Sequence, residues 1–320
     1  MPEFLFIINP TADRGGALKR WQRAEAYLKA QRVDYDLIFT RGSGHALAAA
    51  EEAARSRKYR VIVAGGGDGT SNEVVNGLCR VAGEAPTLPL GVLPIGSAND
   101  LAHVLRIPRD PEEAARYLVE HAREGRIRML DAGRVHSPDV VGPTAPYRYF
   151  LNNCGIGFEA QVGWETRRIR RLRGFLIYLV AVFRSLEHYQ QPHVHVRWDG
   201  KERAERMLLV TIGNGRRAGG GFWLTPYARP DDGLLDVGFA RALSRLGILR
   251  LLPKAINGKH VDDPAFSLDT FQTLEVRTDI PVLVHTDGEI VIEGTRELRV
   301  DVVPGKVQFV CDPNAPLAEV

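Results

Sequence analysis

Residues 61–70 read Val61-Ile62-Val63-Ala64-Gly65-Gly66-Gly67-Asp68-Gly69-Thr70, an apolar run followed by three glycines, a carboxylate and a Gly-Thr pair. The run predicts a buried strand, and the residues from Thr70 onward predict a helix. A helix N-terminus exposes unpaired N–H groups, and glycines let a phosphate approach them. Asp68 would repel that phosphate unless a cation such as Mg²⁺ lay between them. The stretch therefore favours a metal-bound nucleotide over its alternative, a tight turn without a ligand.

Strand and helix patterns alternate around this stretch over the first 130 residues. Such alternation predicts a parallel sheet with helices on both faces. The strand patterns are Phe4–Ile8, Val33–Phe39, Arg60–Ala64 and Leu88–Leu93, and the helical patterns are Leu18–Ala30, His45–Ser56, Thr70–Arg80, Asn99–Leu105 and Pro111–Glu124.

After about Asp131 the pattern changes to short strands separated by Gly, Pro and Asn, which predicts a mainly β domain, an antiparallel sandwich or barrel. We expect an α/β domain over 1–133, a β-rich domain over 134–303, and a segment 304–320 that packs back on the first domain. The predicted strands are Tyr149–Asn153, His193–Trp198, Met207–Ile212, Leu235–Ala240, Thr273–Thr278, Val282–His285 and Leu298–Val303, with helices near Thr166–His188 and Leu243–Ile256.

Composition narrows the class of protein. The 320 residues carry 42 Lys and Arg against 39 Asp and Glu, a net charge of +3 that is too small for a dedicated nucleic-acid binder. The longest apolar run, Gly174–Phe183, is about half of the ~20 residues that cross a bilayer. The N-terminus lacks the basic and apolar regions of a signal peptide, and three widely spaced cysteines argue against disulfides or zinc. A cytoplasmic protein is expected.

Two further loops follow predicted parallel strands. Asn9–Gly16 follows the first strand, and Pro94–Asp100, which contains Ser97 and Asn99, follows the fourth. Open α/β sheets bind ligands at the carboxyl ends of their strands, so these loops and residues 65–70 predict one site. Neither the G-x-x-x-x-G-K-[ST] motif nor a G-x-G-x-x-G motif after the first strand is present, which disfavours a Walker-type nucleotide site and a dinucleotide oxidoreductase.

Five motifs together resemble the soluble diacylglycerol kinase and sphingosine kinase family of lipid kinases, in its bacterial form. They occur in the expected order over nearly the full length, whereas G-G-D-G alone is shared with NAD kinases and phosphofructokinases. The motifs are the loop from Asn9-Pro10, Gly66–Thr70, Gly96–Asp100, the second-domain segments Gly213–Gly221 and Pro226–Asp236, and Asp287-Gly288-Glu289.

The resemblance implies a nucleotide domain like that of NAD kinases, ATP as phosphoryl donor, and a set of nucleotide contacts. Glu73 is implied to lie near the phosphates. The implied ATP contacts are Asn9, Pro10, Thr40, His45, Gly65, Gly66, Gly67, Asp68, Gly69, Thr70, Glu73, Ser97 and Asn99.

The resemblance also implies a general base and two cation sites. Asp287, with Glu289 beside it, would accept the proton of an alcohol, a role that a carboxylate within hydrogen-bond reach can fill. Without the resemblance, Asp287-Gly288 reads as a plain hairpin turn. The implied ligands of catalytic Mg²⁺, through water, are Asp68, Asp100 and Asp131, and those of a structural metal are the Asp232 side chain and the carbonyl groups of Arg229 and Leu234.

The positive excess is concentrated in Arg167, Arg168, Arg170, Arg171 and Arg173, directly before the apolar run. On a single helix, Ile169, Leu172, Leu176, Leu179, Phe183 and Leu186 would form one stripe. Two interpretations stay open: a helix buried in the second domain with solvated arginines, or an element over Arg167–Phe183 that contacts anionic headgroups at the inner face of the membrane.

The sequence therefore predicts an ATP- and Mg²⁺-dependent kinase that phosphorylates a hydroxyl of a membrane lipid such as diacylglycerol. The alternatives are an NAD kinase-like phosphotransferase that acts on a soluble alcohol, and a lipid-binding regulator without activity. Whether the chain forms a homodimer stays open.

Overall fold

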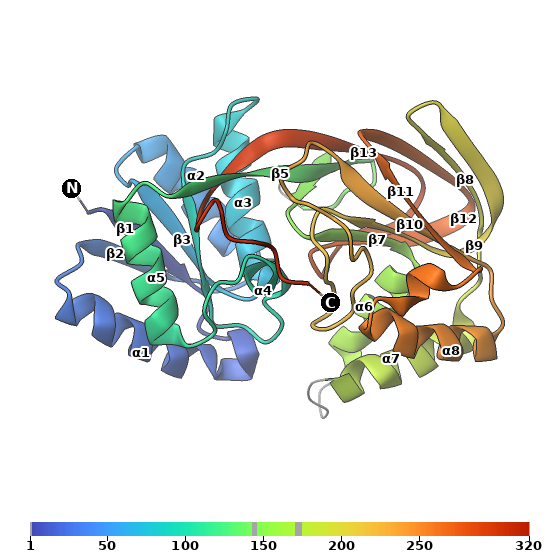
Figure 1. Ribbon diagram of the computed structural model, residues 1–320, viewed down its shortest axis with the longest axis horizontal. Coiled ribbons are helices and arrows are strands. Elements are labelled where there is room, and N and C mark those ends of the chain that lie inside the picture. The colour runs from blue at the N-terminus through green and yellow to red at the C-terminus, as the bar shows by residue number, and fades with distance from the viewer. Residues whose placement is uncertain (1, 143–145, 170–174, 320) are drawn as a thin grey trace. The chain divides into compact units, whose positions relative to one another are not determined.

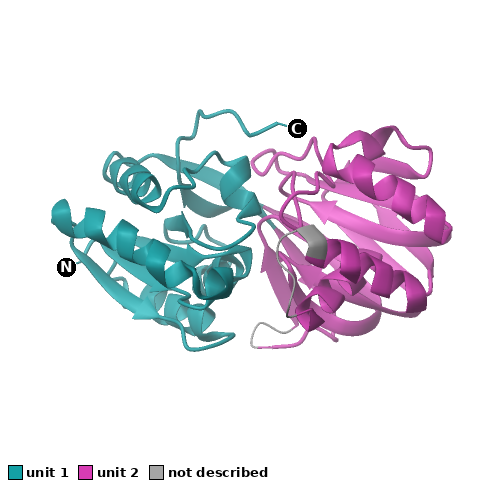
Figure 2. Ribbon diagram, turned by 90° about the horizontal axis from the view of Figure 1, so that it is seen from below, with its two compact units in different colours: residues 1–132, 304–319 teal, residues 133–303, 320 magenta. Residues whose placement is uncertain are grey.

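The structure, a computed structural model, describes residues 2–142, 146–169 and 175–319. It contains two compact units, residues 1–132 with 304–319 (unit 1) and residues 133–303 (unit 2), drawn in Figures 1 and 2. Each unit has its own cluster of buried apolar side chains. The strands β5 (Ile127–His136) and β13 (Glu289–Val310) contribute residues to both units.

The sheet of unit 1 is parallel, and its strands are near-continuously apolar because helices cover both faces. Its order is β2-β1-β3-β4, and the end of β13 adds to β4, with Phe309 opposite Leu90. The four strands are β1 (Phe4–Ile8), β2 (Tyr35–Phe39), β3 (Val61–Gly66) and β4 (Leu90–Pro94).

Helices lie on both faces of this sheet (Figure 1). Trp21 and Leu28 of α1 and Leu118 of α5 share one buried cluster with alternate strand residues. The helices α2 and α3 pack against each other on the opposite face. The helices are α1 (Ala17–Ala30), α2 (His45–Ser56), α3 (Asp68–Ala82), the short α4 (Asp100–Val104) and α5 (Pro111–Arg123), with a 3₁₀ turn at Ala12–Gly15.

The strand order reverses at β1. The chain runs from β1 to the edge strand β2 and then returns to the other side of β1 as β3. The carboxyl ends of β1 and β3 are therefore neighbours, with Ile8 opposite Gly65. In open α/β sheets this switch point is where ligands bind.

Lys306 ties the returning segment to unit 1. Its side chain is 1% exposed, and its ammonium group donates to the carbonyl groups of Gly83 and Ala85 at 2.5 and 2.6 Å. These bonds hold the last part of β13 to the end of α3.

Unit 2 is built from antiparallel strands. Its long strands β9 and β12 each pair with β8 through one half and with β7 through the other, so the strands enclose one core. The strands are β6 (Tyr147–Phe150), β7 (Asn153–Gly157), β8 (His193–Trp198), β9 (Lys201–Gly213), β10 (Leu235–Arg241), β11 (Phe266–Phe271) and β12 (Thr273–Thr286), together with parts of β5 and β13.

Three helices cover part of this β structure (Figure 1). Phe158 of α6, Leu186 of α7 and Ile248 of α8 join one apolar cluster with residues of β9, β10 and β11. The helices are α6 (Phe158–Arg168), α7 (Phe175–His188) and α8 (Arg245–Ile256), and a 3₁₀ turn follows at Lys259–Asp262.

The predicted fold class is confirmed, but several predicted elements of unit 2 are wrong. A single helix over Thr166–His188 does not form: α6 ends at Arg168, Ile169 is extended at φ −96° and ψ 101°, and α7 begins at Phe175. The stripe from Ile169 onward is therefore not on one helix, and Leu172 lies outside the described residues.

Strand boundaries also differ from the prediction. Residues 273–286 form one strand with irregular register, where we expected two strands. Tyr149–Asn153 divides into β6 and β7, while β5 and β11 had no predicted counterpart. Alternation was a weak signal here because bulges shift which side chains face the core.

Gly77 allows the close contact of α3 with α2. This contact positions the turn before α2 and the loop before α3. A Cβ atom at Gly77 would collide with the carbonyl oxygen of Leu47 and approach Ala50. Alanine favours a helix over glycine by ~1 kcal/mol, but overpacking costs ~1–3 kcal/mol. We expect Gly77→Ala to lower the free energy of unfolding, measured by urea titration.

Gly163→Ala in α6 is the matched control, because nothing lies within 4 Å of the position that its added methyl group would take. That change should raise the free energy of unfolding by up to about 1 kcal/mol. Equal stabilisation by both substitutions would contradict the packing described for Gly77.

Candidate functional site

Three loops of unit 1 meet at the switch point, as predicted from the sequence, and each pair is joined by polar contacts. The Asn9 side chain, after β1, donates to Thr70 Oγ1 at 3.2 Å. Ser97, after β4, donates to Asp13 Oδ1 in the first loop at 2.9 Å. The amide of Gly96 donates to the carbonyl oxygen of Gly66 at 2.7 Å. The loops after β1, β3 and β4 therefore form one connected structure.

Glycine is required where two of these loops cross. A Cβ atom at Gly96 would collide with the backbone of Gly67, and one at Gly66 would collide with the Thr70 side chain. Gly65 faces Ile8 with the same result. Gly96 therefore lets the loop after β4 lie against the loop after β3, whereas Gly65 and Gly66 make room for β1 and for the first turn of α3.

Asp68 is the first residue of α3, and Gly69 and Thr70 follow in its first turn. The Asp68 carboxylate accepts hydrogen bonds from the amides of Asp100 (3.2 Å) and Leu101 (3.4 Å), which begin α4. One carboxylate therefore lies at two helix N-termini, where the helix dipoles stabilise its charge. The N-terminus of α3 also offers N–H groups to an anion.

Glu73 orders the turn before α2. Its carboxylate accepts from the amides of Gly44 (2.8 Å) and Ala46 (3.1 Å). His45 Nδ1 accepts from the amide of Arg41 at 2.9 Å, and Thr40 donates its amide to the carbonyl oxygen of Ile8. The Glu73 side chain therefore supports the turn at His45 by binding the main-chain amides on either side of it.

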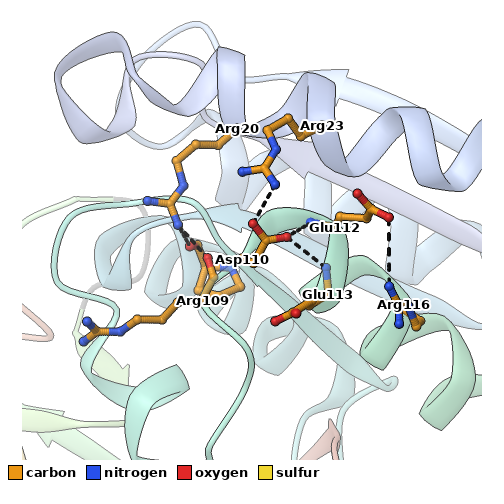
Figure 3. Close-up of polar contacts among 8 residues, drawn as sticks. Arg20, Arg23, Arg109, Asp110, Glu112, Glu113 and Arg116 are labelled. Atoms are coloured by element: carbon orange, nitrogen blue, oxygen red, sulfur yellow. Dashed lines mark hydrogen bonds and ion pairs between the residues drawn. The ribbon is translucent and has the colours of Figure 1, made fainter.

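Asn99 shapes the loop after β4. It adopts a left-handed conformation at φ 54°, and its side chain donates to the carbonyl oxygen of Gly96 at 2.7 Å. From α1, Arg20 donates to the carbonyl groups of Pro94 and Arg109 at 3.0 and 2.9 Å. Figure 3 shows Arg20 at the main chain of Arg109, beside the ion pair of Arg23 with Asp110.

A pocket of about 360 Å³ lies next to this loop. Asp110, which forms part of its wall, caps α5 by accepting from the amides of Glu112 and Glu113. Three arginines outnumber the one carboxylate in its lining, which suits an anionic ligand. The lining includes Arg20, Arg23, Ser97, Asn99, Arg109 and Asp110.

Two of the three carboxylates implied to meet Mg²⁺ through water are buried. Asp100 and Asp131 are each 3% exposed, and Asp131 accepts from the amide of Gly305 at 2.7 Å. Within residues 2–142, 146–169 and 175–319, no group of three His, Cys, Asp or Glu side chains is arranged to hold a metal ion. The Asp68 oxygens, which already accept amide N–H groups, fit contact through water with a magnesium ion that arrives with a nucleotide.

Asp287 lies in unit 2, in the two-residue turn between β12 and β13, so the plain hairpin expected from its sequence does form. Asp287 and Gly288 have φ of 47° and 81°, and Thr286 pairs with Glu289. Asp287 is nevertheless only 7% exposed, and its carboxylate is held by three consecutive amides. The donors are the N–H groups of Leu151 (3.0 Å), Asn152 (2.9 Å) and Asn153 (2.9 Å).

The Gly213-Asn214-Gly215 segment supports the loop that donates these amides. The amides of Asn214 and Gly215 donate to the carbonyl oxygen of Asn152 at 2.9 and 2.8 Å. A Cβ atom at Gly215 would collide with the Asn152 side chain, and one at Gly213 with Thr225. The motif therefore acts on Asp287 through the backbone of residues 151–153.

The other predicted residues of unit 2 are more exposed. Glu289 forms a surface ion pair with Arg167 at 2.7 Å. In the loop of the expected structural metal, Asp232 Oδ1 accepts from the amide of Leu234 at 3.1 Å, and Arg229 Nε lies 3.9 Å from Asp231. Burial, and next the charge of Asp232, raise the pKa of the Asp236 carboxyl to about 7.

Sequence reasoning missed the amides of residues 151–153 and the arginines of the pocket. Main-chain donors have no residue-type signature. Arg20 and Arg109 are 89 positions apart and are joined only by the fold. The glycine segment at 213–215 was the available signal, because glycine often marks a close backbone approach.

Two family models match successive parts of the chain. Residues 3–135 match the diacylglycerol kinase catalytic domain, and residues 152–311 match the YegS C-terminal NAD kinase β-sandwich-like domain. A protein of Pseudomonas aeruginosa named as a probable YegS-like lipid kinase is 34% identical over 83% of this chain and 81% of its own. The diacylglycerol kinase of Bacillus subtilis is 31% identical over 88% of each chain.

A crystal structure of a diacylglycerol kinase from Bacillus anthracis has the same fold, with a TM-score of 0.69 and 21% identity over 97% of both chains. The two domain matches and the extent of the sequence identity establish the family. The chain belongs to the family of YegS-like lipid kinases and diacylglycerol kinases.

Proposed function

We propose that this protein transfers the γ-phosphate of ATP, bound with Mg²⁺, to a hydroxyl group of a membrane lipid such as diacylglycerol. The observation that carries the proposal is the connection of three loops at the switch point of unit 1, with Asp68 at two helix N-termini. The relatives named as diacylglycerol kinases support the acceptor class. ATP would contact Asn9, Gly67 and Ser97.

Phosphoryl transfer depends mainly on alignment and on neutralisation of charge. The amides at the start of α3 and the side chains of the loop after β4 would bind and orient the phosphates. Magnesium, when bound, supplies charge neutralisation on the phosphate oxygens, and Asp68 would meet it through water. A separate cation at Asp232 with the carbonyl groups of Arg229 and Leu234 stays a prediction from the family resemblance.

Asp287 would act as the general base. Its carboxylate would take the proton of the lipid hydroxyl as the oxygen–phosphorus bond forms and ADP leaves. The three amides that hold the carboxylate fix its direction before the substrate binds. Glu289, beside it in the sequence, would add negative charge next to the turn.

A lipid-panel assay with γ-labelled ATP tests this function. We expect the wild type to phosphorylate a lipid hydroxyl in mixed micelles, and EDTA to abolish transfer. Asp68→Asn should lower transfer by at least ~100-fold, because it removes the charge that faces the phosphates while keeping one acceptor for the amides of α4. Thin-layer separation of labelled lipids provides the measurement.

The same assay separates the alternatives. Labelling of NAD without detergent or lipid would favour an NAD kinase-like activity on a soluble alcohol. Vesicle binding with neither transfer nor ATP hydrolysis would favour a lipid-binding regulator. Full transfer by Asp68→Asn would overturn the assignment of the nucleotide site.

The anchoring of Asp287 makes a separate prediction about stability. Removal of a charged acceptor costs about 1.5–3 kcal/mol per hydrogen bond, so Asp287→Ala should lower the free energy of unfolding by at least ~3 kcal/mol. Glu289→Ala breaks only an exposed ion pair and should cost at most ~1 kcal/mol. Urea unfolding would measure both, and equal effects would contradict the buried anchor.

We also propose that the substrate is reached at a membrane surface through the region Arg167–Phe183. No helix within the described residues is long and apolar enough to cross a bilayer. Arg167 and Arg168 end α6 on the surface, and Phe183 of α7 is 53% exposed. The other cluster members, Arg170, Arg171 and Arg173, lie outside the described residues.

Neutralising the five arginines to glutamine should weaken binding to phosphatidylglycerol vesicles, since each basic residue near an anionic surface contributes ~1 kcal/mol. ATP affinity should not change. A control for two of the five charges neutralises Arg197 and Arg277, two exposed arginines of β8 and β12. Vesicle sedimentation is the measurement. Unchanged binding would show that the arginines are solvated and do not contact the membrane.

A further inference from the structure

A buried acid–histidine pair lies beneath the Asp287 turn. His285 Nε2 is 3.1 Å from Glu159 Oε1, and the two side chains are only 7% and 14% exposed. His285 is in β12, two residues before Asp287, and Glu159 is in the first turn of α6. The proposed function assigns neither residue a role.

Hydrogen bonding defines the tautomer of His285. The amide of Gly288 donates to His285 Nδ1 at 3.4 Å, so this nitrogen is an acceptor. A neutral imidazole then carries its proton on Nε2, which donates it to Glu159. The ring therefore connects the far side of the Asp287 turn to the carboxylate of Glu159.

Glu159 also holds the opposite side of the Asp287 anchor. Its Oε1 atom accepts from the Asn153 side chain at 2.7 Å. The main chain of Asn153 makes two hydrogen bonds with Asp287: its amide donates to the Asp287 carboxylate, and its carbonyl oxygen accepts from the Asp287 amide at 2.8 Å. Glu159 Oε1 therefore joins two segments: the Asp287 turn, through His285, and the 151–153 loop, through Asn153.

The backbone leaves space for this pair at one position. Gly155 of β7 lies opposite His285 across the strand pair, and a Cβ atom there would collide with His285 Nε2 and with the Glu159 carboxylate. Glu159 Oε2 is buried and has no hydrogen-bond partner among the described groups. Burial of a carboxylate oxygen without a partner costs free energy, so the two hydrogen bonds at Oε1 are what hold the Glu159 side chain in this place.

We propose that Glu159 and His285 are positioning residues that fix the Asp287 carboxylate toward the lipid hydroxyl. The inference rests on the proposed function, because it assigns them an effect on proton transfer through Asp287. Loss of the pair leaves the anchoring amides present but lets the turn and the 151–153 loop shift relative to each other. Misplacement by ~1 Å costs about 100-fold in rate.

Kinetics of four variants test the proposal. Glu159→Ala and His285→Ala should each lower kcat by ~10–100-fold. KM for ATP should stay at the wild-type value, since the nucleotide loops belong to unit 1. The double variant should lose no more than either single variant, because the two side chains act as one unit. Glu159→Gln, which keeps the Oε1 acceptor for both donors, should recover most of the lost kcat.

His195→Ala and Glu202→Ala are matched controls from the same unit. These residues form a second His–Glu pair at 3.5 Å, but their side chains are 39% and 71% exposed. Neither substitution should change kcat. A loss of kcat as large as that of the buried pair would show a general effect on unit 2 and overturn the positioning role.

A spectroscopic readout separates this inference from the proposed function. In ¹⁵N-histidine-labelled protein, the ring assigned with His285→Gln should show a protonated Nε2 and an unprotonated Nδ1, and Glu159→Ala should change this pattern. If the wild type phosphorylates no lipid, the proposed function fails. The ring spectrum still shows whether His285 is hydrogen-bonded to Glu159. A protonated Nδ1 in the wild type, or wild-type kcat in folded Glu159→Ala and His285→Ala, would overturn the inference.

Discussion

The structure depends on carboxylates that are held by main-chain amides. Asp287 accepts from three consecutive N–H groups, Asp68 from the first turn of α4, Glu73 from the turn before α2, and Asp131 from Gly305. Such bonds fix the direction of each negative charge before any ligand binds, and charge-assisted bonds of this type are about twice as strong as neutral ones. Each bond also ties together segments that are distant in the sequence, so the same contacts build the fold and orient the groups proposed to do chemistry.

This arrangement requires the backbone to approach itself closely, which explains the distribution of the glycines. Gly96 lets the loop after β4 lie against Gly67, Gly215 makes room for Asn152, and Gly155 makes room for the buried pair of Glu159 and His285. At each position a methyl group would meet atoms of a neighbouring segment. The motifs rich in glycine are therefore contact points between segments, and the acidic residues that they accompany are held at those contacts.

Much of unit 1 could be predicted from the sequence because its signals are local. The strand at Phe4–Ile8 and the helix at His45–Ser56 have the predicted bounds, since apolar runs and Ala-rich periodicity mark buried strands and helices. In unit 2 the long strand over 273–286 is irregular in register, and α6 ends before Ile169, the first residue of the predicted stripe, so periodicity misled there. The proposed role of Asp287 came only from the family resemblance, and its amide partners are invisible to residue type because any residue except proline supplies an N–H group.

We propose that the amide-held carboxylate of Asp287 receives the proton of the acceptor hydroxyl. The most direct test is kcat for phosphorylation of diacylglycerol by Asp287→Asn, in protein whose ATP affinity and free energy of unfolding are measured on the same sample. A general base contributes about 10²–10⁴-fold, so Asp287→Asn should lose kcat in that range and retain its ATP affinity. A folded Asp287→Asn variant with the kcat of the wild type would contradict it.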